Sequence, residues 1–349
     1  DGIIKDNWLR EKILRLEKKT KKKFMIKYIL KRLIYAIPIL IGVNLLTFTL
    51  FFVVNSPEEV ARLHLGNKRV TQEQIISWNE ERGYNNPLFY NTDEKGLNAF
   101  KETIFYEKSF KLFLFEFGLS DSGRDIKYDI KQRMWPSLAI ALPSLLVGLF
   151  INITFALFFV YFRSTKVDYI GVIFCVALMS ISSLFYIIGG QYLISKLMHL
   201  VPISGYAHGY EAIKFLVLPV IISVLYGIGS GTRWYRSLFL EEIEKDYVKT
   251  AKSKGLSESA VLFNHVFKNA LIPILTGIVV ILPLLFLGSL IVESFFGIPG
   301  LGSYTIDAIQ SQDFAIVRAM VFLGTILYIS GLILTDISYT LVDPRVRLK

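Results

Sequence analysis

The chain has 349 residues, 53% of them hydrophobic, and a formal net charge of +10 at pH 7. Ordinary soluble domains are about 45–50% apolar, so the total alone is only modestly high and the clustering of apolar residues decides the class. The basic balance would suit nucleic acid or an anionic membrane surface, but no recognised nucleic-acid motif accompanies it, and we expect no nucleic-acid partner.

The first 32 residues are predicted to form a basic N-terminal helix on the cytoplasmic side. They hold twelve Lys and Arg residues and directly precede the first long apolar run, as the positive-inside rule requires. Leu9, Ile13 and Leu16 would share one helical face. An amphipathic helix lying on the inner membrane surface and a merely solvating helix are equal alternatives. The long basic stretch and the missing cleavage site argue against a signal peptide.

Six apolar runs predict an all-α integral membrane protein with six transmembrane helices. A bilayer core needs roughly 20 apolar residues per helix, and five of the runs contain no charged residue, whereas the last contains only Asp336. The domains are a first span, an insertion over 55–134, and a core over 135–349. The runs are 33–54, 135–162, 169–195, 215–232, 269–292 and 319–342.

Alternating crossings place 55–134 outside the cytoplasm and both termini inside. The short loops agree with this arrangement: basic residues outnumber acidic ones in 163–168 and 343–349, whereas acidic residues outnumber basic ones in 293–318. Such a bias orients membrane proteins. The sequence therefore predicts a multi-pass protein of the cytoplasmic membrane with an extracytoplasmic segment after its first span.

Residues 233–268 form the longest inner connection and predict a helix–glycine–helix element. Gly255 follows a lysine-rich helix end, as a C-terminal stop does, and Ser257 can cap a second helix whose apolar face holds Val261, Leu262 and Val266. A rigid element at the membrane surface suits docking of a soluble partner. An ordinary amphipathic loop packed under the bundle is the alternative.

The stretch DYVKTAKSKGLSESAVLFNHVFKNALIPIL, residues 246–275, resembles the cytoplasmic signature (EAA) loop of ABC-importer permeases. Lys249, Thr250, Ala251 and Gly255 fall on the E-A-A-x-x-x-G positions. Lys and Thr at the first two places depart from the general consensus and are similar to the version found in the oligopeptide, dipeptide and nickel permease family.

Other segments resemble the same family in the same order, over about 27–54 and 117–349. The chain looks most like the first (B-type) permease of an oligopeptide importer. Residues 1–26 and most of 55–116 are not covered. The matching segments are KYILKRLIYAIPIL at 27–40, FGLS at 117–120, LVPISGY at 200–206, VESFFGIPGLG at 292–302 and DPRVR at 343–347.

The resemblance implies a channel-forming subunit that carries peptides and is not itself an enzyme. It implies a second homologous permease, an extracytoplasmic substrate-binding protein, surrounding membrane lipid, and two cytoplasmic ATPase subunits that bind ATP and magnesium and dock on the loop 240–268. This chain would bind no cofactor, and it contains no P-loop sequence. The ATPase-coupling residues it implies are Tyr247, Lys249, Thr250, Ala251, Lys254, Gly255 and Leu256.

Three other functions are alternatives to a peptide importer. A nickel or metal-chelate importer shares these motifs. An ion-coupled secondary carrier would usually show internal repeats or charged residues at the membrane midplane, and a membrane enzyme would show clustered catalytic residues, of which we identify none. The four histidines give no helical metal-ligand spacing with a carboxylate, so we predict no metal site.

Glycines and a proline after Phe296 predict a tight outer turn with Gly297, Pro299 and Gly300. The turn is either a gate or a packed structural element. Glu293 is expected either to face the transport pathway or, as we favour, to mark the water interface.

Three further residues or groups receive structural interpretations. Asp336 is expected to form a structural ion pair, either with an arginine at the inner boundary or with the partner subunit. Gly227, Gly229 and Gly231 are expected to allow close helix packing, and Cys175 is expected to be a buried small hydrophobe.

Overall fold

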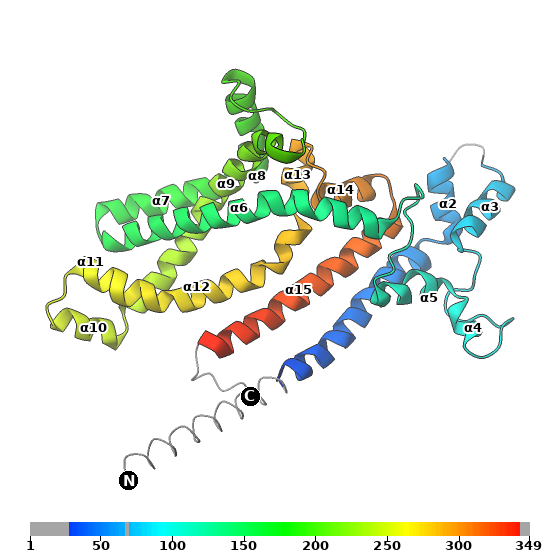
Figure 1. The fold of residues 1–349 in the computed structure, drawn as a ribbon, viewed down its shortest axis with the longest axis horizontal. Helices are drawn as coiled ribbons and strands as arrows, with labels where there is room; N and C mark the ends of the chain where they lie inside the picture. The colour runs from blue at the N-terminus through cyan, green and yellow to red at the C-terminus, as the bar shows by residue number, and fades with distance from the viewer. Residues whose placement is uncertain (1–27, 67–69, 343–349) are drawn as a thin grey trace, which may run out of the picture.

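The computed structural model describes residues 28–66 and 70–342. The expectations for the N-terminal helix and for the tail 343–349 lie outside these residues. The architecture is helical throughout the described part, where the only extended pairing is one isolated bridge between Leu119 and Asp125. Long helices form the centre of the molecule, with smaller helices at its two ends (Figure 1).

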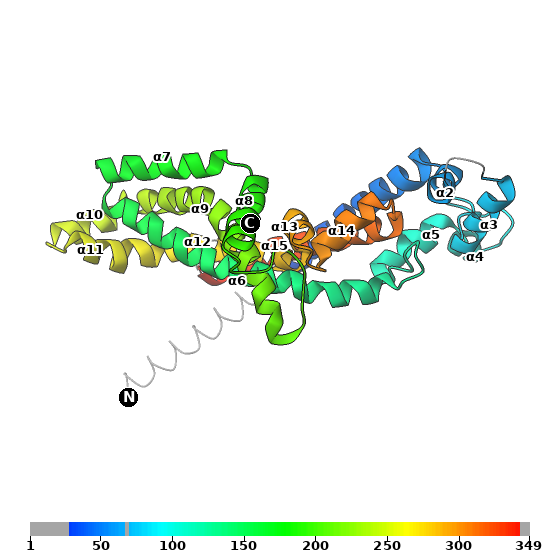
Figure 2. The same cartoon turned by 90° about the horizontal axis from the view of Figure 1, so that it is seen from above.

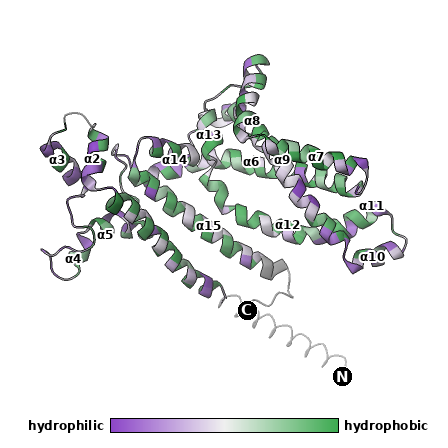
Figure 3. Cartoon of the chain, turned by 180° about the vertical axis from the view of Figure 1, so that it is seen from behind, coloured by the Kyte–Doolittle hydropathy of each residue, from purple (hydrophilic) through white to green (hydrophobic). Residues whose placement is uncertain are grey.

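Within the described residues, five helices are long and apolar enough to cross a membrane, or six if one bent helix pair counts as a single span. Apolar residues cover these helices, whereas polar residues gather at the ends of the molecule (Figure 3). This agrees with the predicted class of integral membrane protein. The five are the unlabelled first helix Tyr28–Val54, α6 (Ile126–Tyr161), α9 (Ala212–Ile243), the helix that contains α12 (Lys268–Ile281), and α15 (Phe314–Val342).

The bent pair replaces the straight span predicted over 169–195. α7 (Lys166–Ser180) is followed by α8 (Ser183–Gly190) and a π-helical turn, η3 (Gln191–Leu197), and the two parts meet at 83°. Ile181 and Ser182 leave the helical region, with ψ values of 126° and 144°. The Ser182 hydroxyl then accepts a hydrogen bond from the amide of Leu184, which caps the second part.

The predicted run 269–292 is likewise interrupted. α12 passes into a short 3₁₀ segment, η6 (Pro283–Leu287), and Gly288 then adopts a left-handed φ of 69°. Two short helices follow, α13 (Leu290–Phe296) and α14 (Leu301–Gln310). Hydropathy could not locate this break, because the residues on both sides of it are apolar.

Two spans are longer than their apolar runs. α6 begins at Ile126 rather than near 135, because the Asp125 carboxylate caps it by accepting hydrogen bonds from the amides of Lys127 and Tyr128. α9 continues past the predicted end at 232 to Ile243. Both extensions carry charged residues beyond the apolar core of the helix.

The insertion after the first helix forms a small helical unit around aromatic side chains. Capping boxes begin α2 at Ser56 and α3 at Thr71. Phe48 and Phe52 of the first helix pack with Trp78 and Tyr84 of the insertion, which fixes the unit to that helix. Its elements are α2 (Pro57–Leu65), α3 (Gln72–Arg82), α4 (Asn98–Lys101), α5 (Ile104–Lys108) and the 3₁₀ turn η2 (Phe110–Leu114).

The predicted ion pair of Asp336 is confirmed, with Arg32 Nε 3.0 Å from Asp336 Oδ2. The glycine prediction is confirmed at two positions: a β-carbon on Gly229 would overlap the Cys175 carbonyl oxygen, and one on Gly231 would overlap the Asn152 side chain. Gly227 has open space beside it instead. Cys175 is buried, as expected.

Two elements at opposite ends bound the long helices. The insertion helices α2–α5 lie at one end, and α10 (Asp246–Ser253) and α11 (Glu258–Val261) lie at the other (Figures 1 and 2). A hydrophobic cluster that includes Phe239 of α9, Val248 of α10 and Val261 of α11 holds the second element against the spans.

Candidate functional site

The segment between α9 and α12 folds as a helix–glycine–helix element. Gly255 has a φ of +77° and its amide donates a hydrogen bond of 2.9 Å to the carbonyl of Lys252. Residues with a β-carbon rarely adopt this left-handed conformation, and the prediction for Gly255 is confirmed. Ser257 accepts a hydrogen bond of 3.3 Å from the amide of Ala260 and so caps α11, also as predicted.

The predicted coupling residues divide between two faces of α10. Ala251 is buried with Val248 in the cluster below the helix. The opposite face and the following turn are exposed, and this surface is basic with one apolar side chain. Its exposed residues are Lys249, Thr250, Lys252, Ser253, Lys254 and Leu256.

Tyr247 fixes α10 to the end of α9. Its hydroxyl donates a hydrogen bond to the buried carboxylate of Glu242, which also forms an ion pair with Lys245. Burial, followed by the hydrogen bond to Glu242, raises the pKa of Tyr247 well above its usual value. Tyr247 therefore positions the element and does not belong to its exposed face.

Ion pairs that the sequence did not predict connect the same element to the neighbouring spans. Arg163, in the turn between α6 and α7, pairs with Glu258 of α11 at 2.8 Å, and Lys252 lies 3.4 Å from the same carboxylate. Arg236 of α9 binds both oxygens of Asp168 at 2.8 Å. Asp168 is only 6% exposed, so this bidentate pair clamps α7 to α9.

The second predicted site, the turn between α13 and α14, encloses a buried carboxylate. Glu293 is 1% exposed. Its Oε2 accepts hydrogen bonds from the amides of Gly302 (2.7 Å) and Ser303 (3.1 Å), and its Oε1 accepts one from Ser289 (3.1 Å). The carboxylate thus occupies the N-terminus of α14, where backbone amides and the helix dipole favour negative charge.

Glu293 is thus buried within the protein at the start of α14, whereas the pathway and the water interface are the two positions predicted for it. A β-carbon on Gly288 or Gly300 would overlap the carboxylate, so these glycines make room for it. This arrangement could not be predicted from local sequence, because the groups that surround Glu293 become neighbours only when the chain folds back.

The remaining turn residues pack against another loop. Phe296 is buried and its carbonyl accepts a hydrogen bond of 2.8 Å from the amide of Gly205. Gly297 ends α13 with a φ of 63°, while Pro299 lies at the surface. The five predicted residues therefore do come together in one packed turn.

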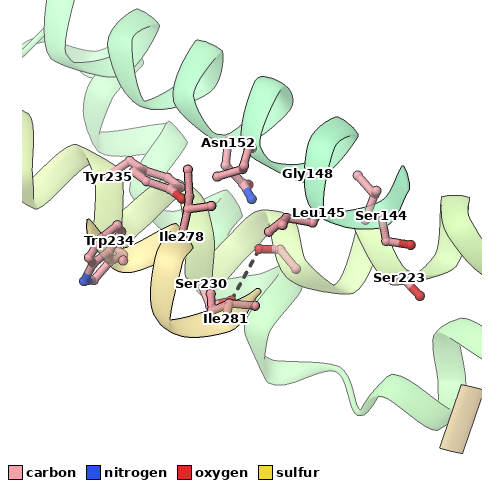
Figure 4. Close-up of a pocket in the computed structure, with 15 residues that line it drawn as sticks. Ser144, Leu145, Gly148, Asn152, Ser223, Ser230, Trp234, Tyr235, Ile278 and Ile281 are labelled. Atoms are coloured by element: carbon pink, nitrogen blue, oxygen red, sulfur yellow. Dashed lines mark hydrogen bonds between the residues drawn. The ribbon is translucent and has the colours of Figure 1, made fainter. Parts of the chain in front are cut away.

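A cleft of about 440 Å³ that the sequence did not predict lies between α6, α9 and α12 (Figure 4). Small residues, among them Gly148, Gly227 and Gly277, line it together with Ser144 and Ser223. Open space beside Gly227 belongs to this cleft, which is why that glycine makes no close helix contact.

Comparison with known proteins agrees with these features. The family described as "Binding-protein-dependent transport system inner membrane component" matches residues 152–348, and the N-terminal family of the same transport systems matches residues 25–111. A Brucella abortus protein named "Putative peptide transport system permease protein" is 32% identical, over 93% of this chain and 99% of the relative.

Two further relatives align over nearly their whole length. The oligopeptide transport system permease protein AppB of Bacillus subtilis is 27% identical, over 92% of this chain and 99% of its own. The dipeptide transport system permease protein DppB of Lactococcus lactis is 28% identical, over 93% and 100%. The chain belongs to the family of binding-protein-dependent transport system inner membrane components.

Proposed function

We propose that this chain is the permease subunit of an ATP-driven importer that moves peptides across the cytoplasmic membrane. Family membership and the printed names of the oligopeptide and dipeptide relatives support this substrate class. ATP hydrolysis would be carried out by separate subunits, and a second, homologous permease would complete the channel.

The observation that carries the proposal is the two-sided α10–α11 element. Its inner face is fixed by Val248, Ala251 and the Tyr247–Glu242 hydrogen bond, whereas its outer face presents Lys249, Thr250 and Leu256 to solvent. A rigid helix with an unpartnered face suits a groove on an ATPase subunit. The ion pairs Arg163–Glu258 and Arg236–Asp168 would transmit movement of that subunit to the spans.

The proposed orientation puts α10 and α11 in the cytoplasm and the insertion outside. The charge bias of the short loops and the position of these elements at opposite ends of the molecule support it. Cysteine-accessibility labelling of Lys252→Cys in intact cells tests this topology. The native Cys175 is buried and should not react. Because position 252 would lie in the cytoplasm, an impermeant reagent should leave the variant unlabelled. Labelling from outside would contradict the orientation.

The insertion would contribute to the docking surface for an external binding protein. Tyr90 and Leu97 expose apolar side chains beside α4, and such residues anchor interfaces more often than charged ones. Replacing both by serine should weaken binding-protein affinity while leaving the aromatic core around Phe48 intact. Unchanged affinity would favour a purely structural insertion.

Uptake assays in a deletion strain decide the substrate. Complementation by this chain should restore uptake of labelled peptides, whereas restoration of nickel-complex uptake alone would favour a metal-chelate importer. ATPase subunits should co-purify with the chain. A single subunit that transports without them would instead favour an ion-coupled carrier.

A further inference from the structure

A second cavity, of about 400 Å³, lies between the insertion and the beginning of α15. Arg82 of α3, Lys108 of α5 and Arg318 of α15 all line it, together with acidic residues. In the proposed orientation it opens on the outer side of the membrane. It is separate from the membrane cleft and from the α10–α11 element.

Most carboxylates around this cavity already have cationic partners. Asp121 lies 3.3 Å from His64 Nε2 and 3.5 Å from Arg82 Nε. Glu107 pairs with Lys111 at 2.8 Å. Arg82 is further shared with Glu81 at 3.5 Å. Among the described residues, these pairs account for Arg82 and Lys111 and leave two lining cations, Lys108 and Arg318, and one lining carboxylate, Glu116, without an ion pair.

Lys108 and Arg318 form no ion pair with any side chain in the part of the chain that the structure describes. Arg318 is 5% exposed and donates hydrogen bonds of 3.1 Å to the carbonyls of Lys108 and Phe314. Its guanidinium lies over the Phe52 ring at 4.7 Å. The Lys108 ammonium lies over the Tyr84 ring at 5.2 Å.

Two cations beside one cavity without an ion-pair partner among the described residues are costly, because backbone carbonyls and aromatic rings replace only part of their hydration. Burial, followed by the charge of Arg318, lowers the pKa of Lys108 to about 8, as expected for such an environment. An anion entering the cavity would offset the lost hydration of Lys108 and its repulsion by Arg318, and would form charge-assisted hydrogen bonds.

We propose that this cavity binds a carboxylate group of a solute, held between Lys108 and Arg318. The carboxylates of Glu81, Glu107, Glu116 and Asp121 also line the cavity, and their charges disfavour a dianionic phosphate relative to a single carboxylate. The carboxylate would come from a small organic acid or from the C-terminus of a peptide. The second source rests on the proposed function, whereas the site itself does not.

The test measures the reactivity of Lys108 in the full chain, purified from the membrane with the subunits that accompany it. An amine-reactive ester labels only neutral lysine, and mass spectrometry quantifies labelling at each position at pH 8. The probes are acetate, N-acetyl-trialanine, its C-terminal amide, and inorganic phosphate. Lys101 is exposed on α4 and serves as an internal control on the same chain.

A carboxylate bound beside Lys108 should raise its pKa by about one unit or more, which slows labelling at pH 8 roughly fivefold. Lys101 should not change. Protection by acetate and by the free-acid tripeptide identifies a general carboxylate site, and protection by the tripeptide alone identifies the peptide C-terminus. Equal protection by the amide, better protection by phosphate, or none by either carboxylate would overturn the proposal.

Two further measurements separate this inference from the proposed function. Lys108→Gln should weaken acetate or tripeptide binding by about tenfold, the size of one charge-assisted hydrogen bond, whereas Lys101→Gln should have no effect. Full retention of binding in Lys108→Gln would contradict the site. If the transporter proves not to take up peptides but carboxylates still protect Lys108, the proposed function is wrong and the carboxylate site stands. The bound carboxylate would then not come from a peptide.

Discussion

The carboxylate of Glu293 accepts a 2.7 Å hydrogen bond from the backbone amide of Gly302, the second residue of α14. This contact joins α13 to α14 across the turn at 297–300. Ser137 of α6 holds Leu301 at the same place, because its hydroxyl accepts a hydrogen bond of 2.8 Å from the amide of Leu301. The end of the interrupted span is thus fixed to α6 through the first turn of α14.

Glu293→Gln should destabilise this turn. The substitution replaces one carboxylate oxygen by an amide nitrogen, which cannot accept a hydrogen bond from the surrounding amides. Loss of a hydrogen bond to a charged group costs about 2 kcal/mol. Cys175 is buried and is the only cysteine, so a thiol-reactive dye reports unfolding. We expect a lower unfolding temperature for Glu293→Gln and an unchanged one for the exposed Glu241→Gln. Equal stability of the two variants would mean that the carboxylate does not hold α14.

Two ion pairs near α10 provide a matched comparison of buried and exposed charge. Arg236→Ala leaves Asp168 buried without its partner and should cost about 3 kcal/mol. Arg163→Ala removes one of the two cationic partners of the more exposed Glu258 and should cost at most about 1 kcal/mol. Chemical or thermal unfolding of the two variants measures the difference. If both have the same stability, the Arg236–Asp168 pair is not the clamp between α7 and α9 that its geometry indicates.

The position of the spans was predictable from the sequence because uncharged runs are a local property. Gly255 and Ser257 were predictable for the same reason, since a helix stop and a helix cap depend on adjacent residues. The bend at Ile181 and Ser182 was not, because no proline or glycine marks it. The surroundings of Glu293, Asp168 and Lys108 were also hidden: Arg236 lies 68 positions from its partner, and only the fold brings them together.

Lys108 should titrate near pH 8, and its burial should make stability depend on pH. The unfolded lysine has a pKa of 10.5 and the folded one a pKa of about 8, so the unfolded chain binds more protons between these values. The free energy of unfolding contributed by this group therefore rises as pH increases from about 8 to 10.5 and is constant below about 8. Burial is the main cause, and the charges of Arg318 and Lys111 add to it, while Glu107 and Asp121 oppose it.

Tryptophan fluorescence is used to measure the unfolding temperature of the unmodified chain and of Lys108→Gln between pH 6.5 and about 10.5. The difference between the two curves should change between pH 8 and 10.5 and be flat between pH 6.5 and 7.5. A difference that is flat throughout would show that Lys108 has an ordinary pKa.

Gly255→Val and Gly231→Val should fail in different ways. No atom lies within 4 Å of a β-carbon built on Gly255, so the substitution meets no steric overlap. Its cost comes from the left-handed φ of +77° and is on the order of 1 kcal/mol. That penalty leaves membrane insertion intact but tilts α10, and with it Thr250 and the exposed coupling face. We expect normal expression of this variant with weaker ATPase association, or with hydrolysis uncoupled from uptake.

Gly231 is the contrasting case, because its backbone conformation is ordinary but its surroundings leave no room for a β-carbon. A β-carbon there would overlap the Asn152 side chain, which accepts the hydrogen bond from Thr232 that joins α6 to α9. Valine should therefore separate these spans and lower the yield of folded protein. Expression, ATPase co-purification and substrate uptake are measured for both variants. Normal ATPase retention and transport by Gly255→Val would show that coupling does not depend on the geometry of this turn. Loss of folded protein only for Gly231→Val would support a packing role for Gly231 and a coupling role for Gly255.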